Sequence, residues 1–198
     1  AALKGSFIKQ MESVAKMIDM GVKDTFRSGS YNRQIFMVSL GSFDTHSDQV
    51  SQHPLLLREL SLGLSKFQTA MEELGHSQKV TSFTMSDFGR TLGNNGDGTD
   101  HAWGAHHFVV GGDGGTSAGN FRGGQMLGNL PDVRIEGDDD YSDKGRIIPT
   151  TAQDQLNATL CRWFGVDDEL MPTLFPNLQN FEVASGDVDS AYLNALFG

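Results

Sequence analysis

QIFMVSL at residues 34–40 and KVTSFTM at residues 79–85 are the two stretches that decide the predicted fold. Both are short runs of apolar and β-branched residues bounded by polar or turn segments, which is typical of strands in a buried sheet. Between them, apolar residues recur at three- and four-residue steps from Pro54 to Gly75, which predicts a helix with the proline in its first turn. A strand, a helix and a second strand in this order predict a βαβ unit. We therefore expect an α/β fold with a mixed, largely parallel sheet flanked by helices.

The rest of the chain extends this pattern. Apolar residues repeat with helical spacing over Ser6–Thr25 and over Thr151–Gly165, where Thr151 is placed to cap the helix. Residues 108–112 predict a third strand and residues 122–127 a fourth. A length of 198 residues fits a single domain over residues 1–198.

Charge and composition exclude several classes of function. The 25 acidic residues outnumber the 15 basic ones, and the net charge of −10 argues against nucleic acid as a partner. No window approaches the roughly 18 consecutive apolar residues of a membrane span, so we expect none. Because Cys161 is the only cysteine, a bound metal must be held by histidines and carboxylates.

Polar side chains follow each of the two deciding strands. Asp44 and His46 come after the first strand, and Asp87 and Arg90 come after the second. Ligands of α/β proteins bind at the carboxyl ends of the strands, so we expect these four side chains to meet there. The alternative is structural, because Asp44 and His46 are also ordinary turn residues and Asp87 is a common helix cap.

More histidines lie a short distance downstream. His101 follows an aspartate, and the adjacent His106 and His107 would point to opposite faces of a strand, so at most one of those two serves the site. Imidazole and carboxylate are the ligands of Zn²⁺, Mn²⁺ and iron, and open sites of this type activate water. The sequence therefore predicts a divalent-metal centre (Zn, Mn or similar), with Arg90 placed to bind an anionic substrate oxygen.

Two acidic stretches and one tryptophan have less specific interpretations. Residues 94–100 and residues 138–143 resemble calcium loops in composition but lack the order of an EF-hand, so turns or acidic surface are favoured. Trp103 either shields the site or packs beneath it, and the sequence favours neither position.

Several motifs carry a family resemblance that covers about residues 34–181. They are Gly41-Ser42-Phe43-Asp44-Thr45-His46-x-x-Gln49, Ser86-Asp87-Phe88-Gly89-Arg90-Thr91, Gly98-Thr99-Asp100-His101-x-Trp103-Gly104, Gly145-Arg146-x-Ile148-Pro149-Thr150-Thr151, Trp163-Phe164-Gly165-Val166 and Leu174-Phe175-Pro176-Asn177-Leu178. In this order they resemble the bacterial family catalogued as domain of unknown function 1501. That family in turn resembles the alkaline phosphatase and sulfatase superfamily, whose fold is an α/β/α sandwich with a two-metal site. The metal ligands that this resemblance implies are Asp44, His46, Asp87 and His101 or His106.

The chain also departs from the superfamily pattern. Phe88 stands where a second histidine is usual, and the nucleophile of the superfamily belongs to an N-terminal segment, so the chain resembles only the C-terminal half of the domain. By this resemblance Thr45, between two implied ligands, is a substitute nucleophile. Family members begin with an export signal, so the resemblance implies a periplasmic or secreted location for the full-length form. Ala1–Gly5 does not resemble such a signal.

Two functions from different classes follow from these observations. The leading hypothesis is a metal-dependent hydrolase of a small anionic ester, either a phosphate or a sulfate. The alternative is a non-catalytic exported protein that keeps the fold for binding or assembly, with its histidines and carboxylates in hydrogen-bond networks. A calcium-dependent module built on the acidic stretches ranks third, and the sequence leaves the oligomeric state open.

Overall fold

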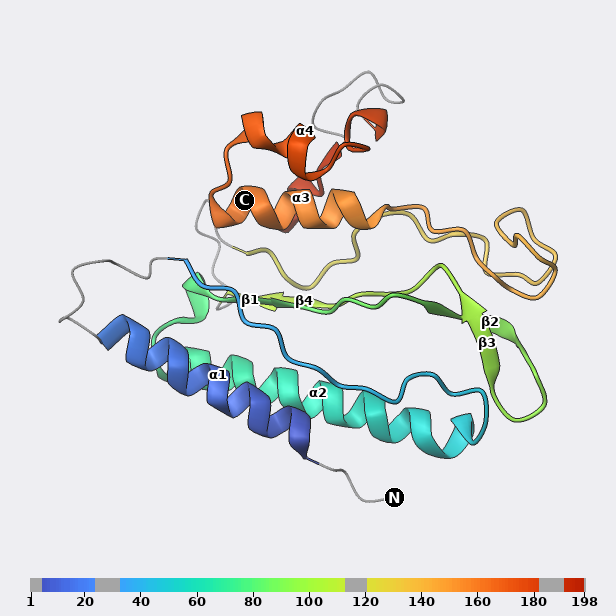
Figure 1. The fold of residues 1–198 in the computed structure, drawn as a ribbon, viewed down its shortest axis with the longest axis horizontal. Helices are drawn as coiled ribbons and strands as arrows, with labels where there is room; N and C mark the ends of the chain where they lie inside the picture. The colour runs from blue at the N-terminus through green and yellow to red at the C-terminus, as the bar shows by residue number, and fades with distance from the viewer. Residues whose placement is uncertain (1–4, 24–32, 113–120, 182–190, 198) are drawn as a thin grey trace.

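The computed structural model describes residues 5–23, 33–112, 121–181 and 191–197, and places two layers of helices around short strands (Figure 1). The helices are α1 (Ser6–Lys23), α2 (Gln49–Glu73), α3 (Gln153–Phe164) and α4 (Met171–Leu174). The strands are β1 (Thr81–Phe83), β2 (Gly89–Asn94), β3 (Thr99–Ala102) and β4 (Val109–Gly111). Short 3-10 turns cover Ser77–Lys79, Asp168–Leu170 and Asn194–Leu196. No helix among the described residues is long and apolar enough to cross a membrane, as expected.

The prediction of a mixed, largely parallel sheet is wrong. Strand β1 pairs antiparallel with β4, and β2 pairs antiparallel with β3, so the described residues form two separate two-stranded sheets. Residues 34–40 are extended but belong to neither sheet. Their burial alternates, and the side chains of Ile35 and Met37 are 83% and 96% exposed. An apolar run favours extended backbone, but pairing also requires a second strand beside it, and the run itself does not encode that strand.

Helices α1 and α2 pack against each other and form one hydrophobic core. Phe7 and Met11 of α1 meet Phe67 and Met71 of α2. The helices approach closely because Gly63 has no side chain. A Cβ at this position would lie 2.3 Å from the ring of Phe7. The prediction of a helix from Ser6 is confirmed as far as Lys23, and residues 24–32 lie outside the described residues.

The predicted starts of the later helices need correction, whereas their ends do not. Helix α2 already begins at Gln49, so Pro54 lies inside it rather than in its first turn. Helix α3 is capped by Ala152 and not by Thr151. Both ends are confirmed, because Gly75 and Gly165 take the left-handed backbone conformation that stops a helix, with φ of 75° and 91°.

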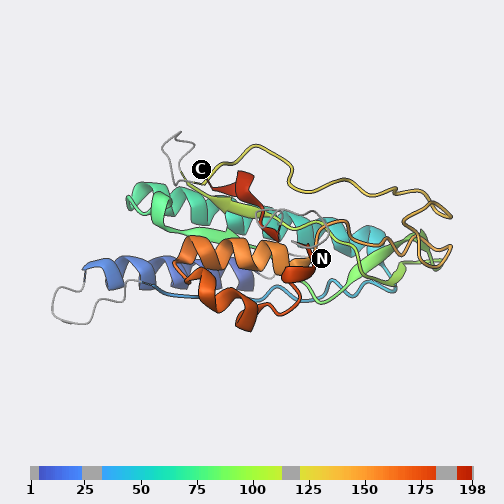
Figure 2. The ribbon, with the colours of Figure 1, turned by 90° about the horizontal axis from the view of Figure 1, so that it is seen from above.

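A hairpin that the sequence analysis did not predict lies at one end of the molecule (Figure 1). It joins β2 to β3, and its turn is closed by a hydrogen bond from the Asn95 amide to the carbonyl of Gly98. The segment that contains Asp44 ends beside this hairpin before α2 begins, as Figure 1 shows. In the second view the chain between β4 and α3 also runs to this end (Figure 2). The prediction of a fourth strand at residues 122–127 is wrong, because only an isolated bridge from Phe121 to Phe197 forms nearby.

Candidate metal centre

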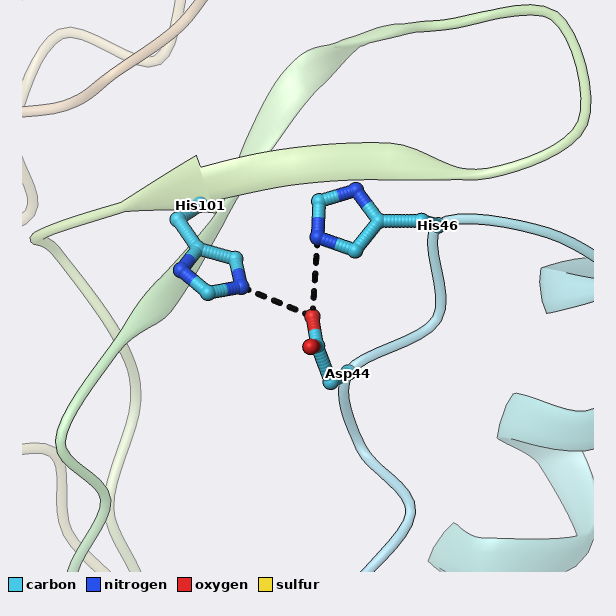
Figure 3. Close-up of side chains that lie close together, drawn as sticks. All are labelled: Asp44, His46 and His101. Carbon is cyan, nitrogen blue, oxygen red and sulfur yellow. Dashed lines mark hydrogen bonds and ion pairs between the residues drawn. The ribbon is translucent and has the colours of Figure 1, made fainter.

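One carboxylate oxygen is the meeting point of the site. Oδ1 of Asp44 lies 3.0 Å from Nε2 of His46, 2.7 Å from Nε2 of His101 and 2.8 Å from Nη1 of Arg90. Figure 3 shows the carboxylate of Asp44 facing both imidazoles. The structure therefore brings together four of the side chains that the sequence analysis selected.

Two chain segments build this cluster. Asp44 and His46 lie in the loop before α2, whereas Arg90 of β2 and His101 of β3 face each other as a paired position of the hairpin. Backbone contacts hold the hairpin on the loop, because the amide of Thr99 donates to the carbonyl of Thr45 and the side-chain amide of Asn95 donates to the carbonyl of His46. The geometry of the site thus depends on a contact between residues about 50 positions apart in the sequence.

The site is open to solvent, and the negative charge of Asp44 is paired with the positive charge of Arg90. The side chains of Asp44, His46 and His101 are 54%, 48% and 52% exposed. The hydrogen bond from His101, followed by that from Arg90, holds the pKa of Asp44 below its ordinary value. We therefore expect Asp44 to be ionised and able to bind a cation near neutral pH.

Arg90 is anchored rather than free. Its Nε donates to Oγ1 of Thr99 at 3.0 Å, its Nη2 donates to the carbonyl of Thr99, and its Nη1 donates to Asp44. The side chain is only 14% exposed. All three guanidinium nitrogens are thus engaged, so this geometry positions Asp44 rather than offering Arg90 to a substrate oxygen.

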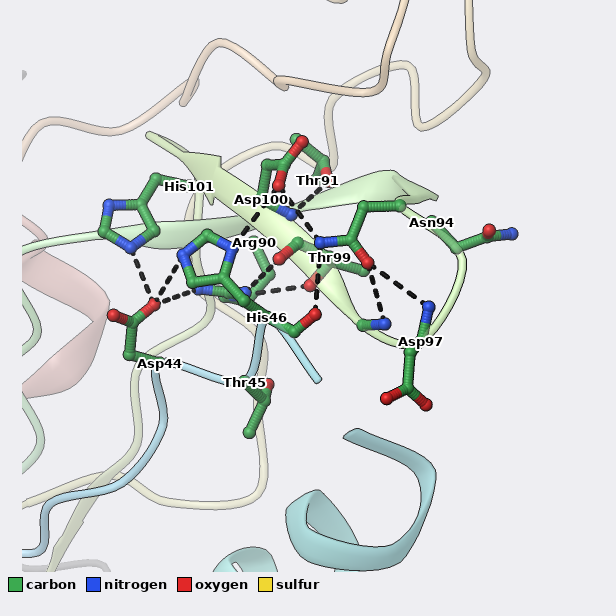
Figure 4. A network of polar contacts seen from close by, with 12 residues as sticks. Asp44, Thr45, His46, Arg90, Thr91, Asn94, Asp97, Thr99, Asp100 and His101 are labelled. Carbon is green, nitrogen blue, oxygen red and sulfur yellow. Dashed lines mark hydrogen bonds and ion pairs between the residues drawn. The ribbon is translucent and has the colours of Figure 1, made fainter. Parts of the chain in front are cut away.

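Two neighbours of the histidines were not predicted as parts of the site. Oδ1 of Asp100 lies 3.4 Å from Nδ1 of His46 (Figure 4). The same oxygen also accepts a hydrogen bond from the side chain of Asn95. The hydrogen bond from Asn95, followed by that from His46, lowers the pKa of Asp100. The ring of Phe88 stacks on His101, with 4.3 Å between centroids and 4° between planes. The adjacent Asp100 and His101 in the sequence were the available signal for the first contact, and no signal marked the second.

The other predicted site residues lie outside the cluster. Asp87 and His106 are exposed and do not belong to the group of side chains that could share an ion. Thr45 is 3% exposed, and its hydroxyl donates to the carbonyl of Phe43. In Figure 4 the side chain of Thr45 points away from Asp44 and His46. The structure therefore gives these three residues no direct contact with the candidate ligand atoms.

The donor set fits a divalent metal with three protein ligands. One ligand atom from each of Asp44, His46 and His101 lies within 4.8 Å of the other two. Ligands of a tetrahedral zinc lie about 3.3 Å apart, so a bound ion would require the present contacts to lengthen by about half an ångström. Oδ2 of Asp44 has no hydrogen-bond partner among the described residues and is available as a ligand atom. Arg90 opposes binding by its charge, so the site is not optimised for affinity alone.

The fold and the cluster define the class of the protein: a mainly helical domain with two small antiparallel sheets and an exposed Asp-His-His cluster. Residues 25–188 match the family described as a protein of unknown function (DUF1501), and the chain belongs to this family. The predicted resemblance to the domain of unknown function 1501 family is thus confirmed, whereas the match does not extend to the alkaline phosphatase and sulfatase superfamily. Neither a curated protein nor a solved structure matches the chain.

Proposed function

We propose that the protein is a metal-dependent hydrolase of small anionic esters, either phosphates or sulfates. The observation that carries this proposal is the convergence of Asp44, His46 and His101 from two segments onto one point. The support of His46 by Asp100 adds to it, because metal-binding histidines usually donate their second ring N–H to a carboxylate or carbonyl.

The proposed division of labour follows the contacts. Asp44, His46 and His101 hold a divalent ion such as Zn²⁺ or Mn²⁺. When bound, the ion polarises the ester and lowers the pKa of a water molecule. Arg90 keeps Asp44 in place. We propose water rather than Thr45 as the nucleophile, since the hydroxyl of Thr45 is buried and points away from the cluster.

The sulfatase-like interpretation is retained only for the chemistry of the ligands. Of the ligands that it implied, Asp44, His46 and His101 lie together and Asp87 and His106 do not, and the sandwich fold that accompanies it is absent from the described residues. Assays with a phosphate ester and a sulfate ester therefore decide between the two substrates.

Metal content and hydrolysis test the proposal, and His106→Ala provides the matched control. We expect about one equivalent of Zn or Mn per chain in the wild-type protein and in His106→Ala, and loss of the ion in His46→Ala, measured by elemental analysis after purification without chelators. The same proteins are then assayed with 4-nitrophenyl phosphate and 4-nitrophenyl sulfate. The proposal fails if the wild type binds no divalent ion in a titration, or if His46→Ala binds it equally well.

One observation favours a second function, that of a non-catalytic binding or structural protein. Arg90 already neutralises Asp44, and the cluster ties the loop before α2 to the hairpin, as a purely structural network would. In that case His46→Ala lowers the free energy of unfolding by the same amount with and without metal. A metal-dependent difference between the two proteins argues for the hydrolase.

A further inference from the structure

An open hollow of about 260 Å³ lies beside the candidate metal centre and shares His101 with it. Its other lining residues are Ala102, Trp103, Tyr141 and Arg146. A closed cavity of about 150 Å³ is enough to bind benzene, and this hollow, which is open to solvent, has space for a substituted six-membered ring to lie against its lining.

Two aromatic rings form the apolar part of the hollow. Trp103 and Tyr141 are 55% and 65% exposed, and their ring centroids lie 4.6 Å apart with 45° between the planes. Large aromatic side chains in contact and yet exposed offer an apolar surface on which a further ring can stack. The sequence left open whether Trp103 shields the site or packs beneath it. In the structure this side chain is exposed and lines a hollow next to the site.

The acidic stretch before α3 holds Tyr141 in place. The carboxylate of Asp140 accepts hydrogen bonds from four backbone N–H groups of its own loop, those of Glu136, Ser142, Gly145 and Arg146. The loop is also bonded to the hairpin, since the amide of Gly93 donates to the carbonyl of Lys144. Asp140 therefore stabilises a preformed loop that presents Tyr141 and Arg146.

Arg146 differs from Arg90 in how many of its hydrogen-bond donors are already engaged. Its Nε donates to the carbonyl of His101 at 3.1 Å, which fixes the side chain beside the cluster. Its two Nη groups have no hydrogen-bond partner among the described residues, whereas every guanidinium nitrogen of Arg90 is engaged. Arg146 is thus the arginine that can receive an oxygen of an anionic ligand.

We propose that Trp103, Tyr141 and Arg146 form the subsite for the organic group of the ester, and that this group is an aromatic ring. The inference rests on the proposed function, because it assigns the leaving group of the same reaction. Two aromatic faces suit the ring of an aryl ester by stacking, and the guanidinium suits its negatively charged oxygens.

Binding of two sulfonates tests the subsite without requiring hydrolysis. Benzenesulfonate and methanesulfonate carry the same anionic group, and neither is an ester, so calorimetric titration measures recognition of the ring alone. We expect the wild-type protein to bind benzenesulfonate about tenfold more tightly. Trp103→Ala should remove this preference by weakening benzenesulfonate only, and Tyr141→Ala should reduce it. Equal binding of the two probes by the wild type, or an unchanged preference in a folded Trp103→Ala variant, overturns the inference.

His46→Ala separates this inference from the proposed function. The variant removes a proposed metal ligand but leaves the hollow intact, so the preference for benzenesulfonate should persist even when both probes bind more weakly. An aryl preference in a wild-type protein that binds no metal would support the subsite and count against the hydrolase. Circular dichroism of each variant shows whether it is folded, and Tyr141→Ala provides the second test because this exposed side chain contributes little to packing.

Discussion

Nδ1 of His46 lies 3.4 Å from a carboxylate oxygen of Asp100, while Nε2 of the same ring lies 3.0 Å from Asp44. A carboxylate on the far side of an imidazole favours the tautomer with its proton on Nδ1. The lone pair of Nε2 is then free to bind an ion placed between His46, Asp44 and His101, whereas without an ion the contact with the ionised Asp44 carboxylate requires a proton on Nε2. Asp100 thus acts on the candidate metal centre through His46, as a positioning residue.

Asp100→Asn should weaken Zn²⁺ binding by about 10- to 100-fold, because the neutral amide orients the imidazole less strongly and makes it less basic. Isothermal titration near neutral pH measures the affinity. Glu73→Gln removes one negative charge from an exposed position at the end of α2 and is the matched control. If both variants bind Zn²⁺ with the same affinity, Asp100 has no positioning role.

The contact between hairpin and loop leaves no room for a side chain at Gly98. A Cβ there would lie 2.2 Å from the carbonyl oxygen of Thr45 and 2.6 Å from the carbonyl carbon of His46. Gly98→Ala should therefore displace the hairpin, lower the free energy of unfolding by roughly 1–3 kcal/mol and abolish metal binding. Gly41→Ala, where nothing lies within 4 Å of the new Cβ, is the control. Urea unfolding and metal titration of both variants check the prediction, and equal behaviour of the two would contradict it.

Sequence patterns predicted local structure better than pairing. The helical periodicity of α1 and the glycines that end α2 and α3 are short-range signals, and all three were read correctly. The parallel sheet was wrong because residues 34–40 are extended without a paired strand, which only a distant segment could supply. The hairpin was not predicted: Asn95-Gly96 and Asp97-Gly98 are typical turn pairs, but the polar composition of residues 94–100 suits an acidic loop equally well.

The candidate site was predicted in part for a related reason. Asp44, His46, Arg90 and His101 were selected from their residue types and their positions after predicted strands, and they do meet. They meet because the β2–β3 hairpin lies against the loop before α2, and not at the edge of a parallel sheet. The anchoring of Arg90 by the backbone and hydroxyl of Thr99 depends on the pairing of β2 with β3, which residue type alone does not reveal.

The loop around Asp140 should be sensitive to acid. Burial raises the pKa of Asp140, but hydrogen bonds from four backbone N–H groups together lower it by more. The pKa of Asp140 therefore lies below its ordinary value. A carboxyl group with a depressed pKa stabilises the folded loop above its unfolded pKa of about 3.9, and this contribution is lost as the pH falls through the folded pKa. Protection of the Gly145 and Arg146 amides against hydrogen exchange should therefore decrease below about pH 4.

Asp140→Asn gives the comparison that this acid sensitivity requires. The variant should show lower protection factors at about pH 6 and a smaller decrease on acidification, since it has no carboxyl group to titrate there. Asp138→Asn, at an exposed position of the same loop, should retain the pH dependence of the wild type. Protection factors of the wild-type loop that stay constant between about pH 6 and about pH 3 would refute the proposed role of Asp140.

Glu59 connects α1 and α2, the two helices that share a hydrophobic core. It is 4% exposed on α2, and its carboxylate accepts a hydrogen bond at 3.4 Å from the amide of Phe7 in the first turn of α1. The first amides of a helix lack partners within the helix, and a negative charge there also favours the helix dipole. Glu59→Ala should therefore lower the free energy of unfolding by roughly 1–2 kcal/mol.

Glu59→Gln keeps an acceptor oxygen and should lower the free energy of unfolding by less. Glu73→Ala, on the exposed end of α2, should stay within about 0.5 kcal/mol of the wild type. Urea denaturation of the three variants measures these differences, and a loss for Glu59→Ala no larger than that for Glu73→Ala would show that Glu59 does not cap α1.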